Sequence, residues 1–251
     1  DPVLHSAKRL ILESLINHPK LSHMKGIFFF TLLFICSLQS FSQKELSGAY
    51  GYSSPVQKAQ PPKDKTAVPG GQLVLVRMED NKYRFWLDVL TGPPGYNRGE
   101  TDGTITFVND TASFDNTFED AEHPCILKFQ LIGSIIRINS LSTSFNCGFG
   151  NGVNADGDYP RLKTQPVLDN KWLRTEYPST PLAMPAGNKT EIFQDENCFV
   201  PFSPKKHLMK TDNFLSIAET EKSIYTEYFP SAGNFVWGWL KKSDIQIIPP
   251  R

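Results

Sequence analysis

Turn-forming residues recur at short intervals from Leu46 onward and divide the chain into brief segments. The 251 residues include 17 glycines and 19 prolines, so residues that interrupt regular structure are abundant. Within the segments, apolar and polar residues alternate, most clearly from Tyr83 to Leu90. Alternation of this kind places successive side chains on opposite faces of a strand. The pattern predicts an all-β protein built from many short strands.

Two groups of strands are expected along the chain. Residues 45–161 contain seven or eight strand-like segments in sequence order, which predict a small antiparallel β-barrel or curled sheet. Residues 162–188 are rich in Pro and Gly, and we interpret them as an interdomain linker. Residues 189–248 hold five or six further short strands, which fit a second small barrel.

An apolar run near the N-terminus has the order of a secretory signal peptide. Lys25 follows Met24, the run extends from Ile27 to Cys36, and small polar residues follow it. The run is shorter than the ~18 residues that a membrane-spanning helix needs. We therefore predict a signal peptide over residues 24–42 and an extracytoplasmic location. A buried helix or a membrane anchor is the alternative.

Residues 1–23 precede this complete export signal, so we interpret them as a non-native upstream extension. Cys36 raises the question of a lipid anchor, but the residue before it is Ile35, where lipoprotein signals carry a small residue. No transmembrane segment is expected in the mature chain.

The charge balance argues against nucleic acid as a partner. The whole chain has 26 basic and 26 acidic residues. Residues 1–42 hold four basic and two acidic side chains, which leaves 22 basic and 24 acidic side chains in the predicted mature chain. Nucleic-acid binding normally needs a positive patch, and no basic excess is present.

Three cysteines remain after cleavage of the signal, and two of them are expected to pair. Cys125 opens an apolar strand and Cys147 lies just past the end of the next strand, so the two can lie side by side. Export to an oxidising compartment favours a Cys125–Cys147 disulfide. Cys198 is then left as a small buried residue or as a thiol that pairs between molecules.

The C-terminal residues resemble bacterial SH3-like (SH3b) domains. The resemblance rests on the stretch Trp237–Ile245, which contains Gly-Trp-Leu-Lys-Lys-Ser-Asp-Ile, and covers residues 189–248. Leu208–Asn213 stands where the family often has Leu-Val-Lys-Gly-Asp, and Thr211 replaces that glycine. The resemblance implies an SH3-like barrel that works as an adaptor for cell-wall peptide or other ligands and has no catalysis of its own.

The N-terminal strands bear a weaker resemblance to small calycin-like barrels and to periplasmic lysozyme inhibitors. Ser47-Gly48-x-Tyr50 is similar to the opening of calycin-like barrels, and the cysteine-bearing strands are similar to those of the inhibitors. The resemblance implies architecture, and a fold does not by itself carry a function.

Catalytic and metal-binding patterns are weak. His123 and His207 are far apart in sequence, and a Cys198/His207 nucleophile pair matches no hydrolase spacing. Asn154–Asp158 is only faintly similar to a calcium loop, and Glu119–Asp120 lies in a turn. We expect no cofactor, no metal and no enzymatic activity.

Four aromatic residues form the candidate binding surface. They are Tyr225, Tyr228, Trp237 and Trp239. Period-two spacing puts Trp237 and Trp239 on one face of a strand, which is either buried core or a platform for peptide or glycan.

Three functions are compatible with these features of the sequence. The first is an exported, non-enzymatic binding module for a cell-wall peptide, a glycan or an envelope protein. The second is an inhibitor of an extracytoplasmic hydrolase such as lysozyme, with residues 91–100 or 146–158 as the inhibitory loop. The third is an enzyme with an unrecognised site.

Overall fold

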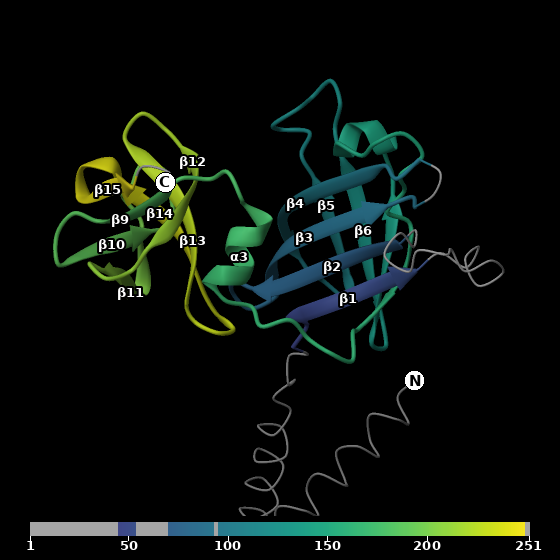
Figure 1. The fold of residues 1–251 in the computed structure, drawn as a ribbon, viewed down its shortest axis with the longest axis horizontal. Helices are drawn as coiled ribbons and strands as arrows, with labels where there is room; N and C mark the ends of the chain where they lie inside the picture. The colour runs from purple at the N-terminus through teal and green to yellow at the C-terminus, as the bar shows by residue number, and fades with distance from the viewer. Residues whose placement is uncertain (1–44, 54–69, 93–94, 249–251) are drawn as a thin grey trace, which may run out of the picture. The chain divides into compact units, whose positions relative to one another are not determined.

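The computed structural model describes residues 45–53, 70–92 and 95–248. The predicted upstream extension and signal peptide, residues 1–23 and 24–42, lie outside this described part. The described residues form an all-β protein, as the sequence predicts. Within them, no helix is both long and apolar enough to cross a membrane. Figure 1 shows two groups of strands joined by a segment that carries the helix α3 (Asn170–Glu176).

The N-terminal half consists of eight strands that follow one another in up-and-down order. The orders β1-β2-β3-β4 and β5-β6-β7-β8 define two four-stranded antiparallel sheets. The strands are β1 (Gly48–Ser53), β2 (Gly70–Arg77), β3 (Lys82–Leu90), β4 (Arg98–Thr106), β5 (Thr111–Asp115), β6 (Ile126–Ile132), β7 (Ile135–Ser140) and β8 (Gly157–Pro160).

The two sheets meet at both seams and enclose one core. Strand β1 approaches the end of β8 through a bridge between Tyr50 and Arg161, and the N–H of Leu162 donates to the carbonyl of Ala49 at 2.9 Å. At the other seam, a bridge between Val108 and Thr111 closes the tight turn that leads from β4 into β5. The predicted curled arrangement of residues 45–161 is therefore what the chain adopts.

Strand β3 is buried on both faces. Phe85 and Leu87 point into the core of the N-terminal half. Trp86 points the opposite way, into a second core that includes residues of the C-terminal strands, and Arg84 is also buried on that side. The alternating side chains of β3 thus contribute to two cores, whereas a surface strand of an antiparallel sheet has one face exposed to water.

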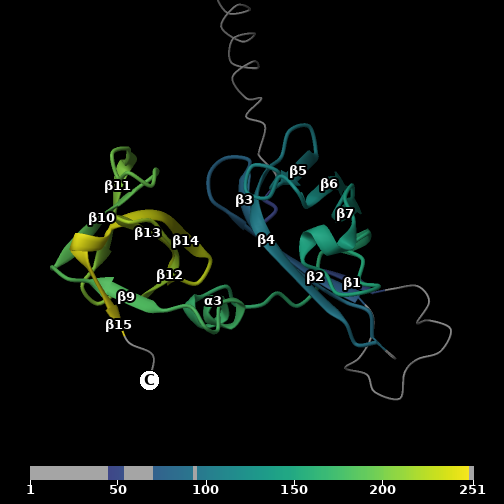
Figure 2. The same cartoon turned by 90° about the horizontal axis from the view of Figure 1, so that it is seen from above.

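The C-terminal half is one seven-stranded antiparallel sheet with the order β11-β10-β14-β13-β12-β9-β15. Figure 2 shows it curled, and register shifts in three of its strand pairs account for the bending. The strands are β9 (Leu182–Pro185), β10 (Lys189–Phe193), β11 (Pro201–Met209), β12 (Phe214–Glu219), β13 (Ser223–Ser231), β14 (Asn234–Lys241) and β15 (Ile245–Ile248), with the short 3-10 helix η4 (Lys242–Asp244) before β15.

The segment predicted as a linker is more structured than its composition indicates. Residues 162–188 contain α3 and also β9, which pairs with both β12 and β15. Strand β9 therefore belongs to the C-terminal sheet. Prolines at 181 and 185 flank or end this short strand, where a missing backbone N–H is tolerated.

Aromatic rings join the two halves. The ring of Trp86 lies 5.0 Å from that of Trp172 on α3 and 6.1 Å from that of Phe235 on β14, both edge-on. Trp172 also contacts Phe229 on β13, at 6.2 Å between ring centroids. Edge-to-face contacts of this kind stabilise by about 0.5–1.5 kcal/mol beyond the burial of apolar area. The halves therefore share an apolar core.

The predicted disulfide is confirmed. Cys125 and Cys147 are bonded, with 4.6 Å between their Cα atoms, and Cys147 ends the 3-10 helix η3 (Ser144–Cys147). Cys198 is a free, buried cysteine.

Replacement of both bonded cysteines by serine should lower the free energy of unfolding by about 3 kcal/mol, because the bond closes a loop across 22 residues and restricts the unfolded chain. Urea unfolding of the Cys125→Ser/Cys147→Ser variant measures the loss. Reduction of the wild-type chain with dithiothreitol should reproduce it, and equal stability of the oxidised and reduced chains would contradict the prediction.

Candidate functional site

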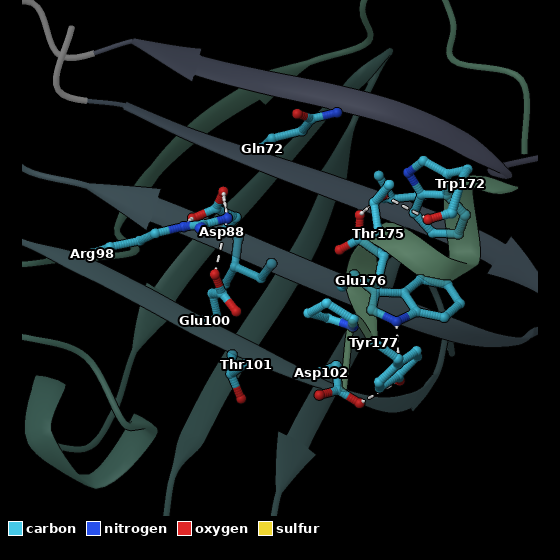
Figure 3. Close-up of a pocket in the computed structure, with 14 residues that line it drawn as sticks. Gln72, Asp88, Arg98, Glu100, Thr101, Asp102, Trp172, Thr175, Glu176 and Tyr177 are labelled. Atoms are coloured by element: carbon cyan, nitrogen blue, oxygen red, sulfur yellow. Dashed lines mark hydrogen bonds and ion pairs between the residues drawn. The ribbon is translucent and has the colours of Figure 1, made fainter. Parts of the chain in front are cut away.

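A cleft of about 310 Å³ lies on the outer face of β2, β3 and β4, beside α3 (Figure 3). The sheet forms its floor, and the helix with the residues that follow it forms one wall. The lining residues are Gln72, Val74, Trp86, Leu87, Asp88, Arg98, Glu100, Thr101, Asp102, Trp172, Thr175, Glu176, Tyr177 and Pro178.

The strand register determines which side chains share the floor. Asp88 pairs across to Gln72 on one side and to Glu100 on the other, so these three side chains form one row. The neighbouring row contains Trp86 and Asp102. Directly opposed residues on one face of a sheet lie close enough for their side chains to interact. The cleft therefore has a polar row next to a partly aromatic row.

The wall is held in place by the start of α3 and by hydrogen bonds at its end. The carboxylate of Asp169 accepts a hydrogen bond from the backbone N–H of Trp172 at 2.9 Å, which caps the helix. At the other end, the indole N–H of Trp86 donates to the hydroxyl of Tyr177 at 3.1 Å. These contacts fix Glu176, between the two, at the rim of the cleft.

Four carboxylates and one guanidinium line the cleft. Arg98 donates to both carboxylate oxygens of Asp88 at 2.8 Å and lies 2.9 Å from a carboxylate oxygen of Glu100. Asp102 is bonded to Arg84, which lies behind the cleft wall. The acidic residues therefore outnumber the basic residue among the lining groups.

The excess of acidic side chains affects the pKa of Glu176. Burial raises the pKa of its carboxyl group above the ordinary value, and the charges of Asp88 and Glu100 raise it further, while Arg98 acts in the opposite direction. Ionisation of Glu176 is consequently disfavoured. A cation placed near it would relieve both effects.

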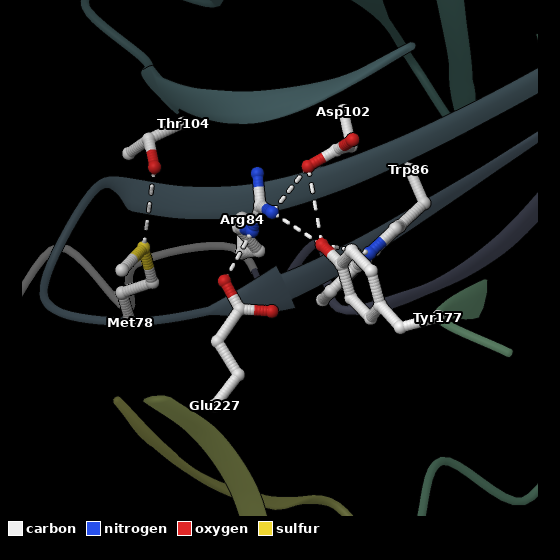
Figure 4. Close-up of polar contacts among 7 residues, drawn as sticks. All are labelled: Met78, Arg84, Trp86, Asp102, Thr104, Tyr177 and Glu227. Atoms are coloured by element: carbon white, nitrogen blue, oxygen red, sulfur yellow. Dashed lines mark hydrogen bonds and ion pairs between the residues drawn. The ribbon is translucent and has the colours of Figure 1, made fainter. Parts of the chain in front are cut away.

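A buried polar cluster lies beside the cleft and joins the two halves (Figure 4). The Nε of Arg84 donates to an oxygen of Glu227 on β13 at 2.5 Å. The guanidinium also donates to the hydroxyl of Tyr177 at 2.5 Å and to Asp102. The Tyr177 hydroxyl itself donates to Asp102 at 3.1 Å.

The two charges of this cluster affect each other. Glu227 is 0% exposed, and burial raises the pKa of its carboxyl group to about 7 even though Arg84 lowers it. Burial by itself lowers the pKa of Arg84, but the charges of Glu227, Tyr177 and Asp102 raise it above the ordinary value. The guanidinium is therefore charged throughout the physiological range, and Glu227 is its buried counter-ion.

The four aromatic residues predicted as a binding surface do not form one open groove. The rings of Tyr225 and Trp239 are 5.5 Å apart across a strand pair and are half-buried. Trp237 is only 6% exposed and packs on Phe202 at 5.1 Å. The hydroxyl of buried Tyr228 donates to Asp212 at 2.8 Å.

Gly238 lies between the two tryptophans and bends β14. Its φ is +142°, and a Cβ at this position would lie 2.5 Å from the carbonyl oxygen of Phe193. Only glycine fits this approach of two backbones. The bend leaves Trp239 half-buried while Trp237 lies under the N-terminal half, where the Nζ of Lys82 is 5.0 Å from its ring centroid.

The weaker candidates have internal partners. Burial, followed by the charge of Asp195, raises the pKa of the Cys198 thiol, which opposes the thiolate that a nucleophile needs. In the segment Asn154–Asp158, Asp158 is bonded to Arg137 at 2.6 and 3.0 Å. Asp120 accepts hydrogen bonds from the backbone of Glu122 and His123. Within the described residues, no group of three or more His, Cys, Asp or Glu side chains is arranged to hold a metal ion.

Sequence reasoning missed the cleft. Arg84 and Asp88 stand at outward positions of the alternating β3 strand, and this polar outer face was the available signal. The α3 residues that complete the cleft were assigned to a linker. Comparisons of the chain with protein-family models, curated proteins and solved structures find no match.

Replacement of Glu176 by Gln should raise the free energy of unfolding at pH 7.5. The pKa of Glu176 is raised in the folded state, so its contribution to stability is present below the ordinary pKa and is lost as the pH rises through the folded-state pKa. Gln removes that loss, and the two chains should become equally stable near pH 4.

Urea unfolding of Glu176→Gln at both pH values tests this expectation. Glu119→Gln, at an exposed position in the β5–β6 loop, is the matched control and should change stability at neither pH. A Glu176→Gln chain that is less stable than wild type at pH 7.5 would show that the carboxylate is stabilising.

Proposed function

We propose that the chain is an exported, non-enzymatic binding module that recognises an amine-bearing component of the cell envelope. The observation that carries this proposal is the acidic cleft with its tryptophan-lined side, formed by β2–β4 and α3. A cell-wall peptide fits these properties because it presents free amino groups on a flexible polar chain. The ligand would lie along the row of Asp88 and Glu100, with its ammonium group at Glu176.

Two features support export. The predicted signal peptide gives a route out of the cytoplasm, and the Cys125–Cys147 disulfide is a bond that persists in oxidising compartments. The resemblance of residues 189–248 to SH3-like domains, which implies an adaptor role, agrees with a binding function.

The chemistry of the cleft favours binding over hydrolysis. A glycosidase needs two carboxyl groups that are available as acid and as base or nucleophile. In this cleft Asp88 and Glu100 are both bonded to Arg98, and Asp102 is bonded to Arg84. Glu176 is therefore left without a second available carboxylate among the lining groups.

Aromatic rings add to the recognition of a cation. Trp172, which is half-buried, lines the cleft beside the carboxylates, whereas Trp86 is buried and already has the guanidinium of Arg84 over its ring. An ammonium group near an indole face is stabilised by about 0.5–1 kcal/mol at exposed sites and by more when it is desolvated. Carboxylate and indole together therefore favour an amine over a neutral sugar.

Isothermal titration with soluble cell-wall peptides that carry a free amine should detect binding to the wild-type chain. Glu176→Gln should weaken it by at least about tenfold, because a charge-assisted hydrogen bond contributes roughly 1.5–3 kcal/mol. N-acetylated peptide should bind no better to wild type than to Glu176→Gln. Glu119→Gln should bind like wild type.

The affinity measured in this titration should change with pH in one direction. Affinity should fall as the pH is lowered through the pKa of Glu176, and the fall should begin at a higher pH than for an ordinary glutamate because that pKa is raised. Equal affinity of the amine-bearing and acetylated peptides, or no binding of either at millimolar concentration, would contradict the proposal.

A second candidate function is inhibition of an extracytoplasmic hydrolase, and the loop geometry favours it. The two loops considered from the sequence pack together: the side-chain amide of Asn97 donates to the carbonyl of Asn151 at 2.6 Å, and the N–H of Gly150 donates to that of Arg98 at 3.2 Å. Tyr96, which is 60% exposed, projects from this pair. A loop held by a neighbouring loop has the pre-organisation that tight inhibitors use.

A lysozyme turbidity assay tests this second function. Micromolar wild-type protein should slow the clearing of bacterial cells, and Tyr96→Ala should restore clearing at least tenfold if the loop enters the active site. Glu176→Gln should leave inhibition unchanged, which separates this function from ligand binding in the cleft. Clearing at the same rate with and without the protein would exclude lysozyme as the target.

A further inference from the structure

Three large apolar side chains are exposed to solvent on the segments that the Cys125–Cys147 disulfide joins. Phe118, on the loop between β5 and β6, is fully exposed, and Leu141 and Phe145 are 64% and 68% exposed. Leu141 follows β7, and its N–H donates to the first residue of β6 at 2.8 Å, whereas Phe145 belongs to η3. Exposed apolar groups that gather on one part of a soluble chain commonly mark an interaction site.

The loop that carries Phe118 is held at its base. The side-chain carbonyl of Asn116 accepts a hydrogen bond from the backbone N–H of Cys125 at 2.6 Å, which closes the loop. The side-chain amide of Asn146 on η3 donates to the carbonyl of Pro124 at 3.1 Å, which ties the loop to the short helix. A loop that is already ordered loses little conformational entropy when a partner binds.

The side chains next to the exposed phenylalanine are acidic. Glu119, Asp120 and Glu122 follow it on the same loop, and all three are exposed. Residues 99–127 hold seven acidic residues and no lysine or arginine. Neither Glu119 nor Glu122 forms an ion pair within the described residues, whereas Asp120 lies 3.8 Å from His123. Carboxylates of this kind beside apolar groups favour a partner whose surface is basic.

The charge of the loop also separates three possible occupants. A second copy of the chain, related by a two-fold axis, would bring the same carboxylates to the contact, so like charges would oppose the pairing. A lipid surface can take up exposed aromatic rings, but anionic headgroups would repel an acidic loop. A basic protein complements both the apolar and the charged groups.

We infer that the loop between β5 and β6, together with η3 and Leu141, is a docking surface for a basic protein. Phe118 enters an apolar pocket of the partner, and Glu119 and Glu122 face lysine or arginine side chains at the rim of that pocket. None of these residues lines the acidic cleft, so the docking surface does not depend on the proposed recognition of a cell-wall amine. It also differs from the second candidate function, in which Tyr96 enters an enzyme active site, because this partner need not be a hydrolase.

Selection from a random-peptide phage library tests the chemistry of the partner. The full wild-type chain is immobilised at physiological salt, the enriched peptides are synthesised, and their affinity is measured by fluorescence anisotropy. The enriched peptides should combine lysine or arginine with at least one large apolar residue. Added salt should weaken their binding, because charges at an exposed surface are screened.

Two variants of the chain locate the binding of these peptides. Phe118→Ala should weaken it about tenfold or more, because a few anchor residues carry most of the binding energy of an interface. Glu119→Lys/Glu122→Lys should weaken it about tenfold and remove most of its salt dependence. All three positions are exposed, so the melting temperature should stay unchanged. Phe199→Ala, which removes an 82% exposed phenylalanine between β10 and β11, is the matched control and should bind like wild type.

Four results would overturn the docking surface. They are enriched peptides that lack basic residues, equal affinity of the peptides for wild type and Phe118→Ala, equal affinity for wild type and the double lysine variant, and no enrichment of any peptide. Loss of binding in Glu176→Gln alone would assign the peptides to the acidic cleft, which would support recognition of an amine while overturning this surface.

Sedimentation with phosphatidylglycerol vesicles decides the lipid case. Neither wild type nor Phe118→Ala should sediment with the vesicles, because the acidic loop is repelled by the anionic headgroups. Sedimentation of wild type but not of Phe118→Ala would show that the loop binds a membrane, and would overturn the proposal of a protein partner.

Discussion

The ion pair between Arg84 and Glu227 is the interaction on which the arrangement of the two halves depends. Both charges are buried, and a buried charge without its partner costs several kcal/mol. Glu227 takes its counter-ion from the other half of the chain, whereas Arg84 is also paired with Asp102 of its own half. The pair therefore favours one docking geometry over others, even where its net contribution to stability is small. Tyr177 and Asp102 extend this constraint, since both bond to Arg84 and both line the cleft.

The cleft follows from unequal coverage of one sheet face. The outer face of β2–β4 is covered at the row of Val74 and Trp86 by aromatic groups of α3 and the C-terminal half. The adjacent row, which begins at Gln72 and contains Asp88, is polar and stays open. Apolar residues on an outward strand face are buried by other segments of the chain, whereas the charged residues beside them stay at the surface. The boundary between the two rows is where a ligand has room.

Local patterns in the sequence predicted the features that depend on residues close together in the chain. The alternation of β3 gave the strand, and the spacing of Cys125 and Cys147 on adjacent strands gave the disulfide. The helix α3 was missed because its seven residues are too few for an apolar period to be recognised among prolines. Period-two spacing correctly placed Trp237 and Trp239 on one face. It could not show what covers that face, because Arg84 lies 143 residues before Glu227 and no local pattern encodes the contact.

Two glutamates have raised pKa values, and their surroundings assign them different roles. Glu176 is half-buried at the rim of an open cleft, among like charges, so an incoming cation can reach it without any movement of the chain. Glu227 is fully buried and is already paired with Arg84, so its charge serves to join the two halves. Binding at the rim therefore needs no separation of the two halves, whereas the packing of Trp86 against Trp172 and Phe235 keeps the Arg84–Glu227 pair enclosed. The aromatic contacts and the buried ion pair thus act together to hold the two halves in one arrangement.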